Sequence, residues 1–411
     1  MNGQWTMLEL PAENLIVIAL VSSHHLGITV AALDPRHGEE PRRHKEFAVR
    51  WAELSQAGRA EALRDALEQT CRPMNLEPRS IFIACSDPSL SATSVTGWSA
   101  LGEDVRISAH ERAFALGRAR THATADDREQ LDVVPTYWTI RTRDGQLDCD
   151  DPVGQIGNHL TCHAMRVTSR RGLQSEFRAI CEDLGLHLEG LIPQPIALYR
   201  GISGRMNKGG TQLVIDLGAR HTTLIVRRKG RLLHLETHPF GGDSVTERIS
   251  VALGVDLVRA DDIKHEIDVD EVPGDDLEGQ QSIFGEIQER QRQHSIAART
   301  AAECLGAFFR DRARNLRDDG DLLSQRGQVH LVGRGAAIRG LVPFLSAVFR
   351  LEVVLGTGSK NTDPGAELDG LLVAGVVKCA ADRRIEHLVE QASSIRGAAG
   401  GIAAWLMQPL A

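Results

Sequence analysis

The chain contains 411 residues, of which 25% are charged and 42% are hydrophobic, as in an ordinary soluble globular protein. This length leaves room for two or more domains, each with its own core. The formal net charge of −8 argues against a general nucleic-acid binder, because neutralising phosphates needs a basic face. The seven cysteines are odd in number and form no CxxC pair, which favours reduced thiols over a disulfide framework or a zinc site.

The first part of the chain predicts a sheet of the RNase H-like type. Leu15–Val21 and Leu26–Leu33 read as a hairpin whose turn is SSHH, because both runs are apolar and short. The first run is too short to cross a bilayer and lacks a basic flank, so we expect a core strand and not a signal peptide. Charged residues in Glu40–Arg50 lead to a third strand, Arg59–Cys71 has helical spacing of apolar residues, and Ile81–Ala84 returns as a strand.

The pattern then changes, which indicates an inserted domain. Ile107–Ala123 predicts a helix opened by Ser108, and Leu131–Ile140 and His159–Val167 alternate as strands. Gly172–Leu184 has its apolar residues on one helical face. The interrupted strand order resumes only after these elements, so the insert lies beside the first lobe instead of within its sheet.

The segment VIDLGARHTTLIV, Val214–Val226, is the most informative one. It predicts a buried strand, a carboxylate–glycine turn and a second strand. In a nucleotide-binding fold, Asp216 could hold a Mg²⁺-bound water and Gly218 would let the backbone approach a phosphate. Thr222 or the next threonine could donate a hydroxyl. An Asp-x-Gly hairpin alone is an ordinary turn, but a second glycine turn at Val329–Gly340 makes the pair typical of actin-like ATPases.

Further elements fill the second lobe. Arg231–Phe240 predicts a strand, and the sequence FGGDSVTE, Phe240–Glu247, predicts a glycine turn that enters a helix with a capping box. Asp268–Gly279 is acidic and contains Pro and Gly, so we expect an exposed loop. Ser282–Arg314 reads as one long helix or two.

The middle of the chain resembles the bacterial cell-division protein family FtsA. Gln130–Ser169 contains the DPVG segment, Asp151–Gly154, and strands that match the family's inserted domain. The connection Leu188–Gly201 and the RADDIK element, Arg259–Lys264, continue the resemblance. The matching positions within the insert are Pro135, Asp151, Pro152, Val153, Gly154, Gly157, Leu160, His163 and Val167.

The resemblance implies an α/β, two-lobed, actin-like (RNase H-like) fold with an inserted small α+β subdomain in the first lobe. We expect the following divisions: 1–85 and 169–205 for the first lobe, 86–168 for the insert, 206–378 for the second lobe with a helical part at 245–325, and 379–411 for a tether and C-terminal amphipathic segment.

The resemblance also implies a nucleotide site in the cleft between the lobes. Its expected members are Asp216, Gly218, Thr222, Gly241, Gly242, Lys264, Gly333 and Gly335. The first phosphate turn, Ser22–His25, departs from the family because it offers no carboxylate, and Arg334 would sit near the base. We therefore expect ATP and Mg²⁺ to bind weakly or not at all, without effective hydrolysis, and we assign no catalytic residue. The histidine pair His24–His25 reads as a solvent-exposed turn.

The implied function is that of a cell-division adaptor. Such proteins polymerise on the cytoplasmic face of the inner membrane, tether FtsZ filaments through the FtsZ C-terminal peptide, recruit later division proteins and bind no nucleic acid. The C-terminal segment places Ile402, Trp405 and Leu406 on one helical face, which predicts weak contact with lipid; a tail packed on its own domain is the alternative. Two other functions are considered. One is that of a PilM-like pilus-assembly protein, because the turn DLGARHTT of this chain resembles the glycine turn of PilM. The other is that of a sugar kinase or ATPase.

Overall fold

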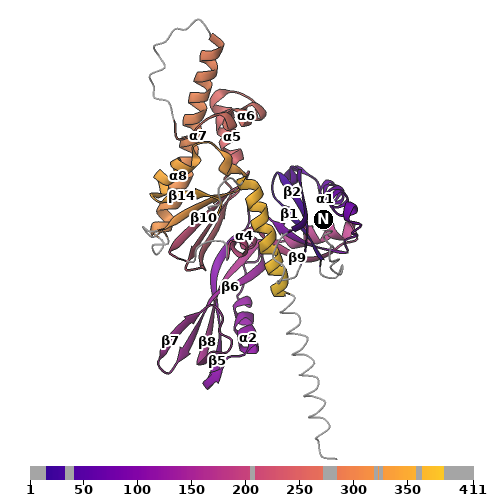
Figure 1. Ribbon diagram of the computed structural model, residues 1–411, viewed down its shortest axis with the longest axis vertical. Helices are drawn as coiled ribbons and strands as arrows, with labels where there is room; N and C mark the ends of the chain where they lie inside the picture. Colours follow the sequence, from indigo (N-terminus) through magenta and orange to yellow (C-terminus); the bar gives the residue numbers. More distant parts are fainter. Residues whose placement is uncertain are drawn as a thin grey trace, which may run out of the picture.

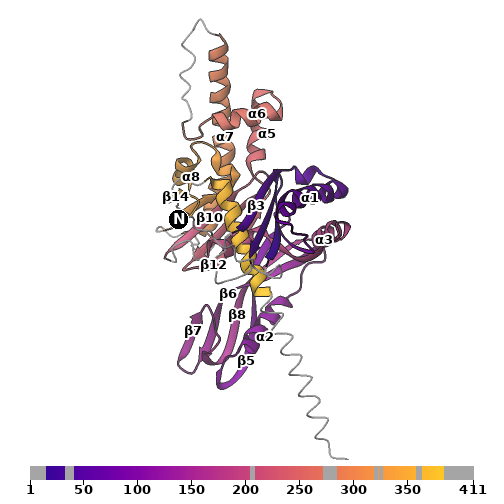
Figure 2. The same ribbon diagram turned by 45° about the vertical axis from the view of Figure 1, so that its right-hand side comes forward.

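The computed structural model describes residues 15–32, 41–203, 209–271, 285–318, 323, 327–357 and 363–383. Two lobes lie side by side, and a smaller insert projects away from both (Figures 1 and 2). Each of these three parts is built on its own sheet. The predicted two-lobed α/β arrangement with an insert is therefore observed.

The sheet of the first lobe has five strands in the order β3-β2-β1-β4-β9. The strands are β1 (Leu15–Val21), β2 (His25–Ala32), β3 (Pro41–Ala48), β4 (Ser80–Cys85) and β9 (His187–Pro193). Helices α1 (Gln56–Cys71) and α3 (Leu173–Asp183) cover one face with apolar side chains such as Leu63 and Phe177. The charged segment after β2 forms the edge strand β3 itself, so it is more than the predicted link to a strand.

The insert is a separate four-stranded antiparallel sheet in the order β5-β8-β6-β7. Its elements are β5 (Ser91–Arg106), α2 (Ala109–Arg120), β6 (Arg128–Thr142), β7 (Gly145–Cys149) and β8 (Ile156–Arg170). Ser108 and Glu111 form a capping box at the start of α2, which confirms the predicted helix start. Its residues are not woven into the first-lobe sheet, as expected.

The sheet of the second lobe repeats the plan of the first, in the order β12-β11-β10-β13-β14. Its strands are β10 (Thr211–Leu217), β11 (Thr222–Arg228), β12 (Arg231–His238), β13 (Gln328–Val332) and β14 (Glu352–Leu355). Its helices are α5 (Gly242–Leu253), α6 (Leu257–Glu266), α7 (Gly285–Asp318) and α8 (Leu341–Phe349). The predicted helix at 282–314 is one helix, and part of the predicted acidic loop lies outside the described residues.

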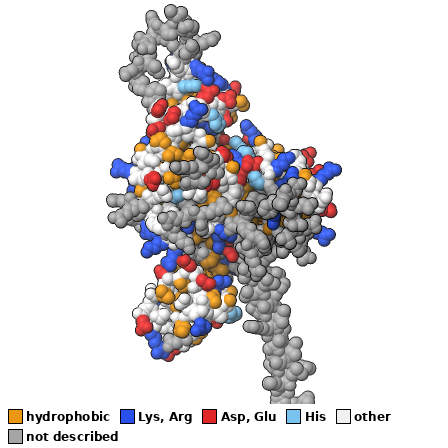
Figure 3. All heavy atoms as spheres, viewed as in Figure 1, with side chains coloured by type: hydrophobic (Ala, Val, Ile, Leu, Met, Phe, Trp, Pro, Cys, Tyr) orange, Lys and Arg blue, Asp and Glu red, His pale blue; other side chains and the backbone are white. Residues whose placement is uncertain are grey.

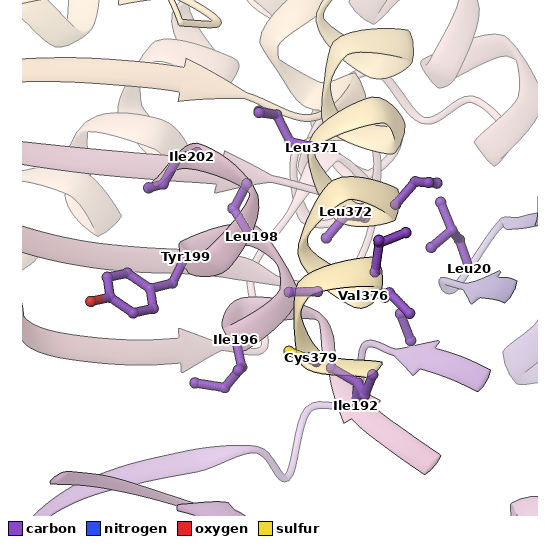
Figure 4. Close-up of a cluster of buried hydrophobic side chains, with 14 of the residues drawn as sticks. Leu20, Ile192, Ile196, Leu198, Tyr199, Ile202, Leu371, Leu372, Val376 and Cys379 are labelled. Carbon is purple, nitrogen blue, oxygen red and sulfur yellow. The ribbon is translucent and has the colours of Figure 1, made fainter. Parts of the chain in front are cut away.

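The two lobes share one buried apolar cluster beneath the cleft. Helix α4 (Gln194–Ile202) and the helix at 364–383 pack against each other between the sheets, as Figure 4 shows. A Cβ on Gly201 would collide with the Leu371 carbonyl, and one on Gly375 with the Ala197 carbonyl. The two helices can therefore touch backbone to backbone only because each has a glycine at the contact.

Two expectations from composition can be compared with the structure. All seven cysteines are free thiols, and five of them are buried. Among the described residues, no helix is long and apolar enough to cross a membrane. The predicted membrane-contact residues Ile402, Trp405 and Leu406 lie outside the described residues.

Candidate functional site

A cavity of about 310 Å³ lies in the cleft between the lobes. Its walls are the β1–β2 turn, the β10–β11 turn, the start of α5 and the short helix η5 (Arg334–Ala337). These are the glycine and serine turns that the sequence singles out. A cavity of this volume is at the lower end of the range of small-molecule sites, roughly 300–1,000 Å³.

Five of the eight residues predicted for the site line this cavity. They are Asp216, Gly218, Gly242, Lys264 and Gly335. The other three, Thr222, Gly241 and Gly333, are not among the lining residues, although they lie in the same turns.

The three residues outside the lining have structural roles. The Thr222 hydroxyl donates to the Phe240 carbonyl over 2.7 Å, and the side chain is fully buried. A Cβ on Gly241 would collide with the Ala219 carbonyl, so this glycine lets α5 approach the turn. Gly333 has φ +91°, and a Cβ there would come within 2.5 Å of Asp216 Oδ1.

Lys264 is engaged by the protein itself. Its Nζ donates to Asp261 Oδ1 over 2.5 Å and to Thr246 Oγ1 over 2.9 Å, and the residue is only 7% exposed. Burial opposes ionisation of Asp261, but the hydrogen bond and charge of Lys264 lower its pKa below the usual value. Lys264, which the sequence predicts as a member of the nucleotide site, therefore lines the cavity with its ammonium group already hydrogen-bonded to the protein.

The β1–β2 turn faces the cleft, which corrects the prediction of a solvent-exposed histidine pair. His24 and His25 both line the cavity. His24 Nε2 lies 3.1 Å from Asp243 Oδ2 at the start of α5, so His24 and Asp243 bridge the two lobes. Burial, then the charge of Arg334, lowers the pKa of His25. The tight turn closes locally, because Ser22 N donates to the His25 carbonyl over 2.9 Å.

A second bridge crosses the cleft on the side of the β10–β11 turn. The Arg220 guanidinium lies 3.3 Å from Asp243 of its own lobe and 3.2 Å from Glu53 of the first lobe. The next residue, His221, has its Nδ1 3.5 Å from Ser86 Oγ in the first lobe. Both residues of this turn thus reach side chains of the opposite lobe.

Arg334 makes the third bridge. Its guanidinium lies 2.6 Å from Glu46 on β3 and 3.0 Å from Asp369 on the helix at 364–383. Its stem runs over Gly365, where a Cβ would come within 2.9 Å of Arg334 Cγ. The arginine expected near the base is therefore held by one carboxylate of the first lobe and one of the helix between the sheets.

Asp216 lacks a partner of this kind. Its Oδ1 is buried, with no hydrogen bond among the described residues. Burial and the neighbouring Asp369 raise the pKa of Asp216 to about 7, whereas the charge of Arg334 lowers it. A buried carboxylate without a partner favours its protonated form.

The residues present fit Mg²⁺ and ATP poorly. The first turn offers no carboxylate, and the amides of Gly242 and Asp243 at the start of α5 already donate to the Gly218 and Ala219 carbonyls over 3.0 Å and 2.8 Å. A helix start whose amides are used internally has fewer donors left for a phosphate. The buried Oδ1 of Asp216 is the feature that still suits a metal-bound water.

Sequence reasoning missed most of the bridging residues. The missed members are His24, Glu46, Glu53, Arg220, Asp243 as a cross-lobe partner, and Asp369. The charged run on the edge strand β3 does not single out these partners, because Glu46 is 36% exposed and edge strands carry charges that prevent pairing with other chains.

Comparison with known proteins identifies the family. A model described as "Cell division protein FtsA" matches residues 213–372, and one described as "SHS2 domain inserted in FTSA" matches residues 89–168. The chain belongs to the FtsA family. The second match coincides with the separate sheet of the insert.

Individual relatives are distant. The cell division protein FtsA of Streptococcus pneumoniae is 23% identical over 72% of this chain and 64% of its own length. FtsA of Escherichia coli is 21% identical over 72% of each chain. This chain thus matches somewhat less than two thirds of the length of the first of these relatives.

A solved structure shows the same fold. The structure of a PilM–PilN type IV pilus biogenesis complex contains a chain with a TM-score of 0.56 and 14% identity, covering 89% of this chain and 98% of that one. The fold is therefore the predicted two-lobed, actin-like α/β fold with an SHS2 insertion in the first lobe.

Proposed function

We propose that the chain is an actin-like adaptor of bacterial cell division that polymerises at the inner membrane, tethers FtsZ filaments and recruits later division proteins. The supporting observation is that the insert and the core of an FtsA protein occur in one chain. The DPVG loop of the insert is ordered locally, because Asp151 accepts from the Val153 amide over 3.1 Å and lies 3.4 Å from Arg112. This insert favours the division function over the PilM-like alternative.

We infer that the C-terminal peptide of FtsZ binds at the corner between α5 and α6. Val251, Leu257 and Val258 are 83%, 55% and 70% exposed there. Large apolar side chains that gather at one exposed corner mark a protein-binding surface more often than a free one.

Binding of a labelled FtsZ C-terminal peptide, followed by fluorescence polarisation, tests this surface. Val258→Asp should weaken binding at least tenfold, because it places a charge in the apolar contact. Leu355→Asp is the matched control, since Leu355 is exposed on β14 and should leave binding unchanged. Unchanged affinity in both variants would remove the α5–α6 corner from the proposal.

The insert is the proposed surface for self-association. Figure 3 shows it as a separate knob with hydrophobic side chains on its visible face. Its exposed large hydrophobic residues are Trp98, Phe114, Leu147, Val153 and Ile156. Phe114→Asp should reduce filament formation in negative-stain micrographs, whereas filaments of normal length would contradict this role.

Membrane contact is proposed for the C-terminal segment, from its sequence alone. Ile402, Trp405 and Leu406 share one side of a helical period, and several copies in a polymer would supply the avidity that one short segment lacks. Deleting 397–411 should abolish sedimentation with anionic lipid vesicles. Unchanged sedimentation would instead support a tail that packs on its own domain.

The nucleotide site is proposed to be degenerate. The three cross-lobe bridges of His24, Arg220 and Arg334 support this, because each places a charged pair of the protein where the lobes face each other. We propose that ATP and Mg²⁺ bind weakly or not at all and that hydrolysis is negligible.

A further inference from the structure

Three polar side chains meet where the edge strand β3 faces the helix at 364–383. His44 and Glu46 alternate on β3, opposite Thr29 and Gly27 of β2. His44 Nε2 lies 3.4 Å from Glu46 Oε1 and 3.9 Å from Asp369 Oδ2. The ligand atoms of all three residues lie within 4.8 Å of one another.

These separations suit a shared metal ion. Nitrogen and oxygen ligands of a divalent transition metal lie about 2.0–2.2 Å from the ion, so two ligands of one ion are roughly 3–4 Å apart. One imidazole and two carboxylates form a donor set that zinc, iron and manganese accept. The cluster could therefore bind an ion with little rearrangement of the backbone.

The imidazole is already oriented. Thr29 Oγ1, which is fully buried, lies 2.7 Å from His44 Nδ1 and leaves Nε2 directed toward the carboxylates. A Cβ on Gly27 would come within 3.3 Å of His44 Cε1, so the glycine gives the ring room. Metal-binding histidines are generally fixed in this way through their second ring nitrogen.

The surroundings carry more negative than positive charge. Asp369 and Glu46 lie 3.0 Å and 2.6 Å from the same guanidinium, that of Arg334. Independently of the cluster, Asp216 Oδ1 is buried without a hydrogen-bond partner in the described part of the chain, and it lies against Gly333, the residue before Arg334. Two carboxylates that share one guanidinium leave a negative charge that a second cation would neutralise.

There is also space beside the carboxylates. A cavity of about 20 Å³ is lined by Glu46, Asp369 and Arg334, which is enough for one water molecule or ion. Arg334 comes from the second lobe, whereas His44 and Glu46 lie on the first-lobe strand β3 and Asp369 lies on the helix at 364–383 between the two sheets.

We propose that His44, Glu46 and Asp369 form a site for a divalent transition metal ion, at which the ion competes with Arg334 for the two carboxylates. Metal binding and the Arg334 bridge then become alternatives. An ion bound at this site displaces Arg334 from Glu46 and so weakens the attachment of the second lobe at this end of the cleft. The proposal does not depend on the partners or the nucleotide state assigned above.

Titration of the purified full chain with Zn²⁺, followed by calorimetry, tests the site, with Co²⁺ absorption as a spectroscopic check. We expect one site per chain that weakens at least tenfold in Glu46→Gln and in His44→Ala. Arg334→Ala should bind Zn²⁺ at least severalfold more tightly, because the competing charge is gone. His110→Ala, which removes an exposed histidine on α2, is the control for unspecific binding to surface histidines.

The alternative is that the cluster is an ion-pair network that keeps the edge strand β3 from pairing with other chains. In that case Zn²⁺ binding is the same in Glu46→Gln, His44→Ala and the intact chain, or absent from all three, and the proposal is overturned. Arg334→Ala with unchanged Zn²⁺ affinity overturns the competition. Thermal unfolding without metal confirms that each variant is folded, and the metal-induced rise in Tm gives a second readout.

Discussion

The two lobes are joined in two different ways. Beneath the cleft, α4 and the helix at 364–383 form a dry contact within an apolar cluster that includes side chains of both sheets. Across the cleft, the lobes meet through polar and charged side chains centred on His24, Arg220 and Arg334. Apolar burial depends little on salt, whereas partly exposed ion pairs weaken with salt and pH. The lower contact should thus be insensitive to salt, whereas the upper one should weaken as salt is added.

The largest expected effect comes from the helix contact. Gly375→Ala places a methyl group against the Ala197 carbonyl and should cost roughly 1–3 kcal/mol in urea unfolding, as overpacking does. Gly370→Ala is the matched control in the same helix, since a Cβ there meets nothing within 4 Å. The control should be neutral or stabilising by up to about 1 kcal/mol. Equal effects of the two changes would contradict the close contact.

The second-largest effect is expected for Asp216→Asn, which should change how the free energy of unfolding depends on pH. Because its folded-state pKa is raised to about 7 from 3.8, the folded protein retains a proton that the unfolded chain releases. Stability should therefore fall as the pH rises from 4 toward 7 and stay low above it. Asp216→Asn should remove this loss, on the order of 2 kcal/mol between pH 5 and pH 8. Asp65→Asn, an exposed position on α1, should leave the pH profile of unfolding unchanged.

Arg334→Ala should change the free energy of unfolding less than the Asp216 variant does. It should also increase the separation of the two lobes. It removes a counter-charge from Asp369, but the Arg334 side chain is 31% exposed and solvent screens the pair, so a loss of about 1 kcal/mol is expected. Small-angle scattering should show a larger radius of gyration as the lobes separate. Arg141→Ala, on an exposed part of β6, serves as the control, and an unchanged radius in both variants would argue against a bridge.

The smallest effect is expected for His24→Ala. The pair with Asp243 is partly exposed, with side chains 27% and 28% accessible, and such pairs contribute about 0–1 kcal/mol. The difference from the intact protein should shrink further in high salt. A loss well above 1 kcal/mol that persists in high salt would mean that the turn, and not the charge, is stabilising.

The sequence was sufficient for those parts of the fold that depend on local pattern. Apolar runs predicted the strands β1 and β10, and Ser108 predicted the start of α2. The DPVG segment indicated the inserted domain. The glycine turns led to five residues that line the cleft. These features are readable because each is set by neighbours in the chain.

The partners across the cleft were not predictable from the sequence. Lys264 pairs with Asp261 three residues away, yet its burial depends on how α5 and α6 pack. His24 and Asp243, or Glu46 and Arg334, meet only once both lobes are folded and placed. The sequence around a charged residue in a turn does not show whether its side chain faces solvent or a residue of the other lobe.

The most direct test of the account is equilibrium binding of a fluorescent ATP analogue to the intact protein, with and without Mg²⁺. The central claim is that the side chains of the protein, and not a nucleotide, bridge the lobes at the cleft. We predict weak binding or none at submillimolar analogue, with no strengthening by Mg²⁺ and no steady-state hydrolysis. Tight, Mg²⁺-dependent binding with turnover that disappears in Asp216→Ala would contradict it.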